Sequence, residues 1–278
     1  MKKIEFTGER YLPTLTEMMI NLEHLSRYYA FAVLCKNKVV LDAACGMGYG
    51  SNHLADFADR VFGIDIAADV IENNTENYRK NNLMFQVASI EKLPFEDQFF
   101  DTVISLETIE HVDMHAQRNF LEEVKRVLKE DGCFVVSTPD KKFYTDAHPN
   151  WKNQFHIHEF YYDEFYTFLS HYFKNVNILK QNIYPASIIW NPKSIQPLQI
   201  NGLIEGNDKQ IHYCDPQRFD YLIAVCSDAE LPDVPSLVTA DVQYKLIMDY
   251  IRPYAMRVNE LEERLRKQQP YSSFSITV

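Results

Sequence analysis

Short apolar runs alternate with longer amphipathic stretches through most of this chain. The runs are rich in Val, Ile, Leu and Phe and end in polar turns, a pattern typical of buried strands. They lie at Val39–Asp42, Val61–Asp65, Met84–Ala88, Thr102–Leu106, Cys133–Ser137, Asn175–Lys180 and Tyr221–Cys226. Because the first five alternate with helical stretches, the sequence predicts an α/β fold with a Rossmann-like, doubly wound sheet of seven strands.

One helical stretch, Ala116–Lys129, is especially regular. Its apolar residues recur at helical spacing, at Phe120, Leu121, Val124, Val127 and Leu128. This stripe predicts a helix packed against the sheet. The dipeptide Asp131-Gly132 is expected to end that helix before the fifth strand.

Three regions lie outside this alternation. Residues 1–36 hold a helical stretch at Glu17–Leu34, which we expect to form a lid over a ligand bound to the domain at 37–228. Residues 184–217 form an insertion expected to shape the substrate site. Residues 229–278 hold a linker and a helix with about three heptads. That helix is either a short coiled coil, joining two copies or a partner, or a terminal helix on its own domain.

Composition narrows the classes of function. The 278 residues are 46% hydrophobic, enough for a substantial core. The formal net charge of −11 disfavours a protein that grips a nucleic-acid backbone. We see no signal peptide and no membrane span, so we expect a cytoplasmic protein. The five cysteines are scattered without a C-x-x-C pair, which indicates reduced thiols rather than disulfides or a zinc site.

The most informative motif follows the first predicted strand. The segment Val39–Gly50 runs from an apolar strand into an acidic, glycine-punctuated turn and then into a helix, as in sites that receive a nucleotide-like cofactor. The second strand ends in Asp65, where a carboxylate can hold both ribose hydroxyls. The glycine spacing departs from the dinucleotide motif, and no P-loop lysine follows. Asp42 would repel a pyrophosphate but suits a ligand with an ammonium and a sulfonium group.

On these residues the chain resembles the class I S-adenosylmethionine-dependent methyltransferases. The likeness runs from about residue 38 to 228 and includes the segments Ala88–Phe95 and Phe100–Ser105. It implies that S-adenosylmethionine is bound through Asp42, Ala44, Gly46, Gly48, Asp65, Ile66, Ser89, Ile90 and Leu106. It also implies an antiparallel pair of strands at one sheet edge. Ser89 departs from the family, which often has Asp at this position.

Candidate proton acceptors follow the fourth and fifth predicted strands. Glu107, Glu110 and His111 are spaced i, i+3 and i+4, so on a helical turn they would share one face. Such a set serves as a general base with orienting carboxylates, as cation ligands, or simply as an acidic helix start. His156 and Glu159 lie in a later loop expected to close over the same pocket. The candidate catalytic residues are therefore His111, His156, Glu110 and Glu107.

A narrower resemblance concerns the acceptor. The segments Gly8–Pro13 and His24–Tyr28, with those around the candidate catalytic residues, look like bacterial methyltransferases of surface-glycan pathways, including those that cap O-antigen chains. This likeness implies that Tyr11 and Arg27 reach the cofactor, with Arg27 pairing with its carboxylate.

A second narrow resemblance concerns metal. Glu-x-x-Glu-His followed by a distant histidine is similar to the metal-binding set of small-RNA terminal 2′-O-methyltransferases. Carried over, it implies that Glu107, Glu110, His111 and His156 hold an Mg²⁺-class ion. Magnesium, however, rarely relies on histidine.

The sequence thus predicts an S-adenosylmethionine-dependent O-methyltransferase acting on a sugar, glycan or related small molecule. His111 or His156 would take the acceptor proton, and Glu107 and Glu110 would orient that base or hold a metal. One alternative is a methyltransferase of another small metabolite, such as a quinone or an antibiotic intermediate. Another is a non-catalytic, cofactor-binding scaffold that recruits a glycan enzyme through the C-terminal helix.

Overall fold

The structure, a computed structural model, describes residues 18–150, 152–183, 203–204, 211–212, 219–234, 256–257, 260–261 and 264. The strands are β1 (Val39–Ala43), β2 (Arg60–Asp65), β3 (Leu83–Val87), β4 (Phe100–Leu106), β5 (Leu128–Pro139), β6 (Asn175–Gln181), β7 (Leu203–Ile204), β8 (Ile211–His212) and β9 (Tyr221–Ser227). The helices are α1 (Met18–Phe31), α2 (Tyr49–Leu54), α3 (Ala68–Asn77), α4 (Met114–Val127), α5 (Lys141–Tyr144) and α6 (Tyr162–Ser170), with 3-10 turns η1 (Ala32–Cys35) and η2 (Ile109–His111).

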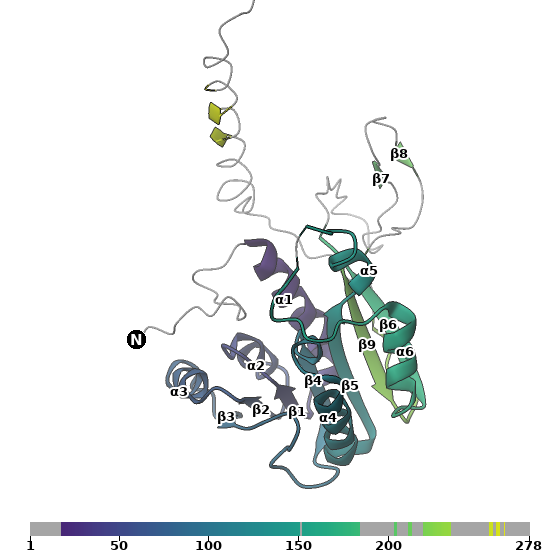
Figure 1. Ribbon diagram of the computed structural model, residues 1–278. Coiled ribbons are helices and arrows are strands. Elements are labelled where there is room, and N and C mark those ends of the chain that lie inside the picture. The colour runs from purple at the N-terminus through teal and green to yellow at the C-terminus, as the bar shows by residue number, and fades with distance from the viewer. Residues whose placement is uncertain are drawn as a thin grey trace, which may run out of the picture.

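Seven strands form one sheet in the order β3-β2-β1-β4-β5-β9-β6 (Figure 1). Strands β1 to β5 run parallel, whereas β9 is antiparallel to both β5 and β6. All seven predicted strands and the antiparallel edge pair are therefore confirmed. Strand order reverses beside β1, which pairs with β2 on one side and β4 on the other. Ligands of such sheets bind at the carboxyl ends of the strands at this reversal.

Each face of the sheet carries its own apolar core. Successive residues of β5 point to opposite faces, so Phe134 and Val136 join one cluster while Val135 joins the other. The first cluster packs against α4 and α6 and includes Phe120 and Phe165. The second packs against α1, η1 and α2. Figure 1 shows the resulting three layers, with the sheet between helices.

The predicted helix at 116–129 exists, but its boundaries differ from those expected. It begins at Met114, where the Asp113 carboxylate caps it by accepting the backbone N–H of Ala116 at 2.9 Å. It ends at Val127, because Leu128 already pairs with Phe100 in the sheet. Asp131-Gly132 therefore lies within β5 rather than between helix and strand, at a register shift before Cys133. Strand pairing overrode the local helix-stop signal.

The described part of the predicted lid is α1, followed by the turn η1. Tyr11, most of the 184–217 insertion and most of the C-terminal heptads lie outside the described residues, so the proposed domain division stays a prediction. Among the helices that the structure describes, none has the length and hydrophobicity needed to cross a membrane.

Candidate active site

A turn of unusual backbone geometry follows β1. Ala44, Gly46 and Gly48 have φ angles of 61°, 50° and 70°, in the left-handed region that favours glycine. A Cβ atom on Gly48 would lie 2.8 Å from Asn74 and 2.9 Å from Phe85, whereas one on Gly46 would meet nothing within 4 Å. Gly48 is thus required for packing beneath the turn, and Gly46 leaves its backbone open to a ligand.

Asp65, at the end of β2, holds this turn in place. One carboxylate oxygen accepts the backbone N–H of Gly46 at 3.1 Å, and the other accepts that of Ala67 at 2.9 Å. The Asn74 amide donates to the Gly46 carbonyl oxygen at 2.7 Å from the other side. Each carboxylate oxygen of Asp65 keeps acceptor capacity, so the residue can hold the turn and a ribose diol together.

Asp42 plays a different part from the one expected. Its fully buried carboxylate accepts hydrogen bonds from Ser51 Oγ at 2.6 Å and from the Tyr28 hydroxyl at 3.2 Å. Burial raises the pKa of the Asp42 carboxyl to about 6, although the hydrogen bonds from Ser51 and Tyr28 act in the opposite direction and lower it. It is not among the lining residues of the cavity described next, so its side chain braces the turn from behind instead of facing an ammonium group.

A cavity of about 510 Å³ opens at the carboxyl ends of β1, β2 and β4. Among the predicted cofactor residues it is lined by Ala44, Gly46, Asp65, Ile66, Ser89, Ile90 and Leu106. All four candidate catalytic residues, Glu107, Glu110, His111 and His156, line it as well. The volume falls within the range of small-molecule sites. One continuous cavity therefore brings both predicted residue sets together.

Arg27 is not among the described residues that line this cavity. It is 1% exposed, and its Nε donates to Gln181 Oε1 at 2.6 Å. Its Nη1 lies 3.5 Å from Glu107 Oε1, and the guanidinium sits over the Tyr221 ring, 4.5 Å from the centroid. Among the described residues neither Nη atom has a hydrogen-bond partner. The implied contact with a cofactor carboxylate stays a prediction.

The acidic turn after β4 is not the regular helix turn that the spacing suggests. Glu107 has a φ of 52°, and only Ile109–His111 form a 3-10 turn. The Glu107 carboxylate accepts the Ser137 hydroxyl at 2.7 Å, and the same hydroxyl accepts the Glu107 backbone N–H at 3.0 Å. Glu107 is thus tied to β5 and Arg27. The expectation of one shared helical face with Glu110 and His111 was wrong.

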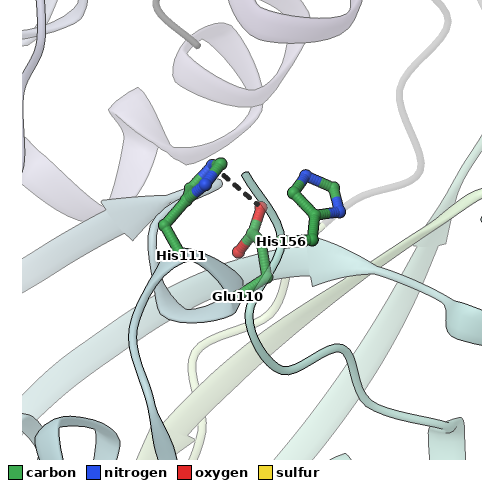
Figure 2. Close-up of side chains that lie close together, drawn as sticks. All are labelled: Glu110, His111 and His156. Atoms are coloured by element: carbon green, nitrogen blue, oxygen red, sulfur yellow. Dashed lines mark ion pairs between the residues drawn. The ribbon is translucent and has the colours of Figure 1, made fainter. Parts of the chain in front are cut away.

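Glu110 is buried beside two imidazole rings. Its Oε1 lies 3.9 Å from His111 Nε2, and Figure 2 shows the Glu110 carboxylate between the rings of His111 and His156. Burial, helped by the nearby Glu107 charge, raises the pKa of Glu110 well above its usual range. Neither carboxylate oxygen has a hydrogen-bond partner within the described part of the chain. Glu110 is therefore poised to hold a proton or a cation.

The two histidines come from segments far apart in the chain and meet with ring centroids 5.0 Å apart. His111 Nδ1 lies 3.1 Å from the backbone carbonyl oxygen of Phe155 and must donate to it. His156 Nδ1 lies 2.5 Å from Glu159 Oε1, and His156 Nε2 lies 2.9 Å from Asn153 Nδ2. The backbone N–H groups of residues 157 and 158 both donate to the Glu110 carbonyl oxygen, at 2.8 and 3.1 Å. The loop and the turn are therefore fastened together.

The expected four-residue metal set is only partly assembled. Ligand atoms of Glu110, His111 and His156 lie within 4.8 Å of one another, and Glu107 is not in this group. Two imidazoles and one carboxylate suit zinc- or manganese-type ions better than magnesium, which prefers oxygen ligands.

Several lining residues were given no role in the site from the sequence. Glu23, His24 and Tyr49 approach from α1 and α2, while Tyr144, Asn153 and Tyr221 come from α5, the following loop and β9. The Tyr49 hydroxyl and His24 Nδ1 are 3.0 Å apart, and burial lowers the pKa of His24 to about 3. The Tyr221 hydroxyl donates to Glu23 Oε2 at 3.0 Å, and burial raises the pKa of Glu23 to about 6. Packing of α1 brings Glu23 and His24 to the cavity, whereas the other four residues reach it from separate segments of the chain.

The fold belongs to the Rossmann-like class, and the glycine turn lines the cavity at the carboxyl ends of the strands. Comparison with known proteins specifies the class further. Residues 41–136 match the family model described as "Methyltransferase domain". Over these residues the chain is therefore similar to S-adenosylmethionine-dependent methyltransferases.

Two curated relatives and one solved structure illustrate the similarity. A probable S-adenosylmethionine-dependent methyltransferase of Mycolicibacterium smegmatis is 33% identical over 157 residues, which are 56% of this chain and 60% of that protein. A phthiotriol/phenolphthiotriol dimycocerosates methyltransferase of Mycobacterium tuberculosis is 33% identical over 47% of this chain and 46% of its own length. The match thus spans only part of either relative. The PH0226 protein of Pyrococcus horikoshii shares the fold, with a TM-score of 0.52 and 24% identity over 80% of this chain and 100% of its own.

Proposed function

We propose that the chain transfers a methyl group from S-adenosylmethionine to a hydroxyl group of a sugar, glycan or related polar small molecule. The single observation that carries this proposal is that one cavity joins the glycine turn and Asp65 to the Glu110, His111 and His156 cluster. Methyl transfer needs both parts, because the enzyme must align acceptor and methyl group and also remove the acceptor proton.

The residues at the glycine end fit the cofactor. The open backbone at Gly46 would lie under its methionine part, backed by Leu106, and Asp65 would hold the ribose hydroxyls. Ile66, Ser89 and Ile90 would flank the adenine. When bound, the cofactor supplies a methyl group on a sulfonium, which is an activated leaving group.

The residues at the histidine end would handle the acceptor proton. His111 and His156 both line the cavity, and each has Nδ1 against an acceptor, so the opposite nitrogen is directed away from that anchor. Glu110, whose pKa burial raises well above its usual range, would hydrogen-bond beside them. Removing both rings together would abolish transfer while leaving the glycine end intact.

The proposed acceptor class rests on the polar lining of this end. Tyr144, Asn153, Tyr221 and Glu107 offer hydroxyl, amide and carboxylate groups that suit a hydroxylated ligand. The mycobacterial relative named for phthiotriol dimycocerosates supports a lipid hydroxyl as an alternative. A quinone or an antibiotic intermediate would use the same proton-handling groups.

A cation site is a second role for the histidine cluster, favoured by the closeness of the Glu110, His111 and His156 ligand atoms. Histidine ligands of metals usually donate their other ring N–H to a carboxylate or carbonyl, and Glu159 and the Phe155 carbonyl oxygen are in such positions. The donor set favours zinc- or manganese-type ions over the magnesium implied by resemblance. A non-catalytic scaffold, by contrast, has no use for this cluster.

The experiment begins with the heat of binding of S-adenosylmethionine and S-adenosylhomocysteine, measured by titration calorimetry before and after EDTA treatment. Formation of S-adenosylhomocysteine is then followed with nucleotide sugars, oligosaccharides, quinols and lipid alcohols as acceptors. We expect binding of both cofactor forms and turnover with a sugar. The combined change His111→Ala and His156→Ala should abolish turnover but keep binding. Absence of binding by the wild-type protein contradicts the proposal, and turnover by the double variant contradicts the assigned role of the histidines.

A further inference from the structure

We propose that Glu159 is a positioning residue that fixes the tautomer of His156, with the proton on Nδ1 and the Nε2 lone pair directed to the cavity. The Asn153 amide donates a hydrogen bond to that lone pair, and an acceptor hydroxyl would take the place of the amide when the substrate binds. This inference rests on the proposed methyl transfer and makes His156 a base that can take the acceptor proton at Nε2.

The orientation of the Asn153 amide is the first step. Its Oδ1 accepts the backbone N–H of Phe155 at 3.0 Å, which leaves Nδ2 as the end that faces His156. An amide nitrogen can only donate. At 2.9 Å, His156 Nε2 must therefore accept, and it carries a lone pair rather than a proton.

The second step concerns the other ring nitrogen. A neutral imidazole with an unprotonated Nε2 carries its proton on Nδ1. Glu159 Oε1 lies 2.5 Å from that nitrogen, in position to accept the proton. The side chains of His156 and Glu159 are only 5% and 8% exposed, so little water competes for this bond.

Glu159 is itself held, because the Thr145 hydroxyl donates to the same Oε1 at 2.8 Å. The His156 bond, the Thr145 bond and the nearby Lys141 charge keep the pKa of Glu159 below its usual value in spite of burial. Glu159 is not among the described residues that line the cavity, whereas His156, Asn153 and Tyr144 are. The Tyr144 ring stacks on the His156 ring, with centroids 5.5 Å apart and planes 25° apart. The ring is thus fixed in orientation as well as in tautomer.

This arrangement specifies the proton transfer. An acceptor hydroxyl that displaces the Asn153 amide donates its hydrogen to His156 Nε2. As the O–H bond breaks, its proton bonds to Nε2, its electron pair forms the new bond to the methyl carbon, and the electron pair of the sulfur–carbon bond stays on sulfur. The imidazolium formed is paired with the Glu159 carboxylate, which stabilises its charge.

The tautomer can be measured without knowing the acceptor. We would record two-bond ¹H–¹⁵N correlation spectra of ¹⁵N-histidine-labelled, EDTA-treated full-length protein at pH 8, and assign the rings with His111→Gln and His156→Gln. We expect His156 to show a protonated Nδ1 and an unprotonated Nε2. In Glu159→Leu the ratio of the Nδ1–H form to the Nε2–H form should fall about tenfold, because a hydrogen bond to a charged group is lost.

Glu159→Gln is the matched control. Its side-chain oxygen still accepts the Nδ1 proton, so it should retain the wild-type tautomer that Glu159→Leu loses. An Nε2–H form of His156 in the wild type overturns the inference, and so does an unchanged ratio in Glu159→Leu. Calorimetric titration of S-adenosylhomocysteine into Glu159→Leu should give wild-type affinity. Failure of the wild type to bind it contradicts the proposed function, whereas wild-type binding with the wrong tautomer contradicts only this assignment.

Discussion

The two ends of the cavity are held by different kinds of contact. At the glycine end, backbone groups set the shape: left-handed residues after β1 and the N–H groups of Gly46 and Ala67 on Asp65. At the histidine end, side chains such as His111 and Gln117 join segments that are far apart in the chain. Backbone conformation and backbone N–H groups therefore shape the cofactor end, whereas side-chain contacts between segments shape the acceptor end.

This difference matters for the division of labour in the domain. Backbone geometry within a few residues is compatible with many surrounding sequences, provided the glycines stay. Side-chain contacts between distant segments change whenever one partner changes. We therefore expect substitutions at the glycine end to affect cofactor binding, and substitutions at the histidine end to affect catalysis with cofactor binding intact.

The largest effect should come from Gly48→Ala. The new Cβ combines a left-handed φ of 70° with contacts under 3 Å to Asn74 and Phe85. We expect the free energy of unfolding to fall by about 2–4 kcal/mol, measured by urea denaturation.

Gly46→Ala is the matched control, because its Cβ meets no atom within 4 Å. Its stability should fall by only about 1–2 kcal/mol, while affinity for S-adenosylhomocysteine falls roughly tenfold as the methyl group enters the cavity. Equal losses of stability in the two variants would show that the contacts of a Cβ at position 48 with Asn74 and Phe85 do not destabilise the fold.

Next in size is Asp65→Ala. Losing the carboxylate removes the acceptor of two backbone N–H groups and the proposed ribose partner. Affinity for S-adenosylhomocysteine should fall roughly 10- to 100-fold by calorimetry. Asp69→Ala, which changes an exposed acidic residue in the first turn of α3, should leave the affinity unchanged. Comparable loss in both variants would point to net charge rather than to Asp65 itself.

At the histidine end, Gln117→Leu should separate stability from cofactor binding. The buried Gln117 amide donates to the carbonyl oxygens of Ile109 at 2.8 Å and Val112 at 3.3 Å, and lies 3.4 Å from that of His158. The free energy of unfolding of the variant should be about 1–2 kcal/mol lower than that of the wild type. The variant should lose methyl transfer, and its affinity for S-adenosylhomocysteine, measured by calorimetry, should be unchanged. Asn119→Ala on the same helix is the control. A large drop in affinity would mean that the two ends are not separable.

The smallest effect concerns pH and Asp42. Because burial raises its folded pKa to about 6, above the usual 3.8, the native state binds the proton more tightly than the unfolded state. As pH falls from 7.5 to 5, the wild type should therefore gain stability relative to Asp42→Asn, on the order of 1 kcal/mol. Parallel urea-denaturation series at the two pH values test this. The carboxyls of Glu23 and Glu110 are present in both variants, so their contributions cancel. A constant difference would mean that Asp42 titrates normally.

Much of the main sheet and the glycine turn could be predicted from residues that are close in sequence. Apolar runs located β1, β2, β4 and β9 to within about two residues, because a strand buried on both faces needs a continuous apolar run. The glycine turn was readable because its conformations demand glycine. The end of α4 was not, since Leu128 joined a strand through pairing with Phe100, a partner that helical periodicity does not reveal.

The histidine end shows where local inference fails. Spacing placed Glu107 on one helical face with Glu110 and His111, but contacts with Ser137 and Arg27 hold it in another conformation. Asp42 was expected to face the ligand, yet Ser51 and Tyr28 bind its carboxylate behind the turn. In both cases the deciding partner comes from outside the local motif.

The sequence by itself determined the sheet, the glycine turn and the residue types available for chemistry, because these depend on hydrophobic periodicity and on conformations that few residues can adopt. Only the tertiary structure decided which polar groups face the cavity and which brace it. It buried Glu110 between two imidazoles, joined His111 to the Phe155 carbonyl oxygen and turned Asp42 inward. Such choices depend on the hydrogen-bond partners that distant segments bring within about 3 Å, and a linear pattern does not encode those distances.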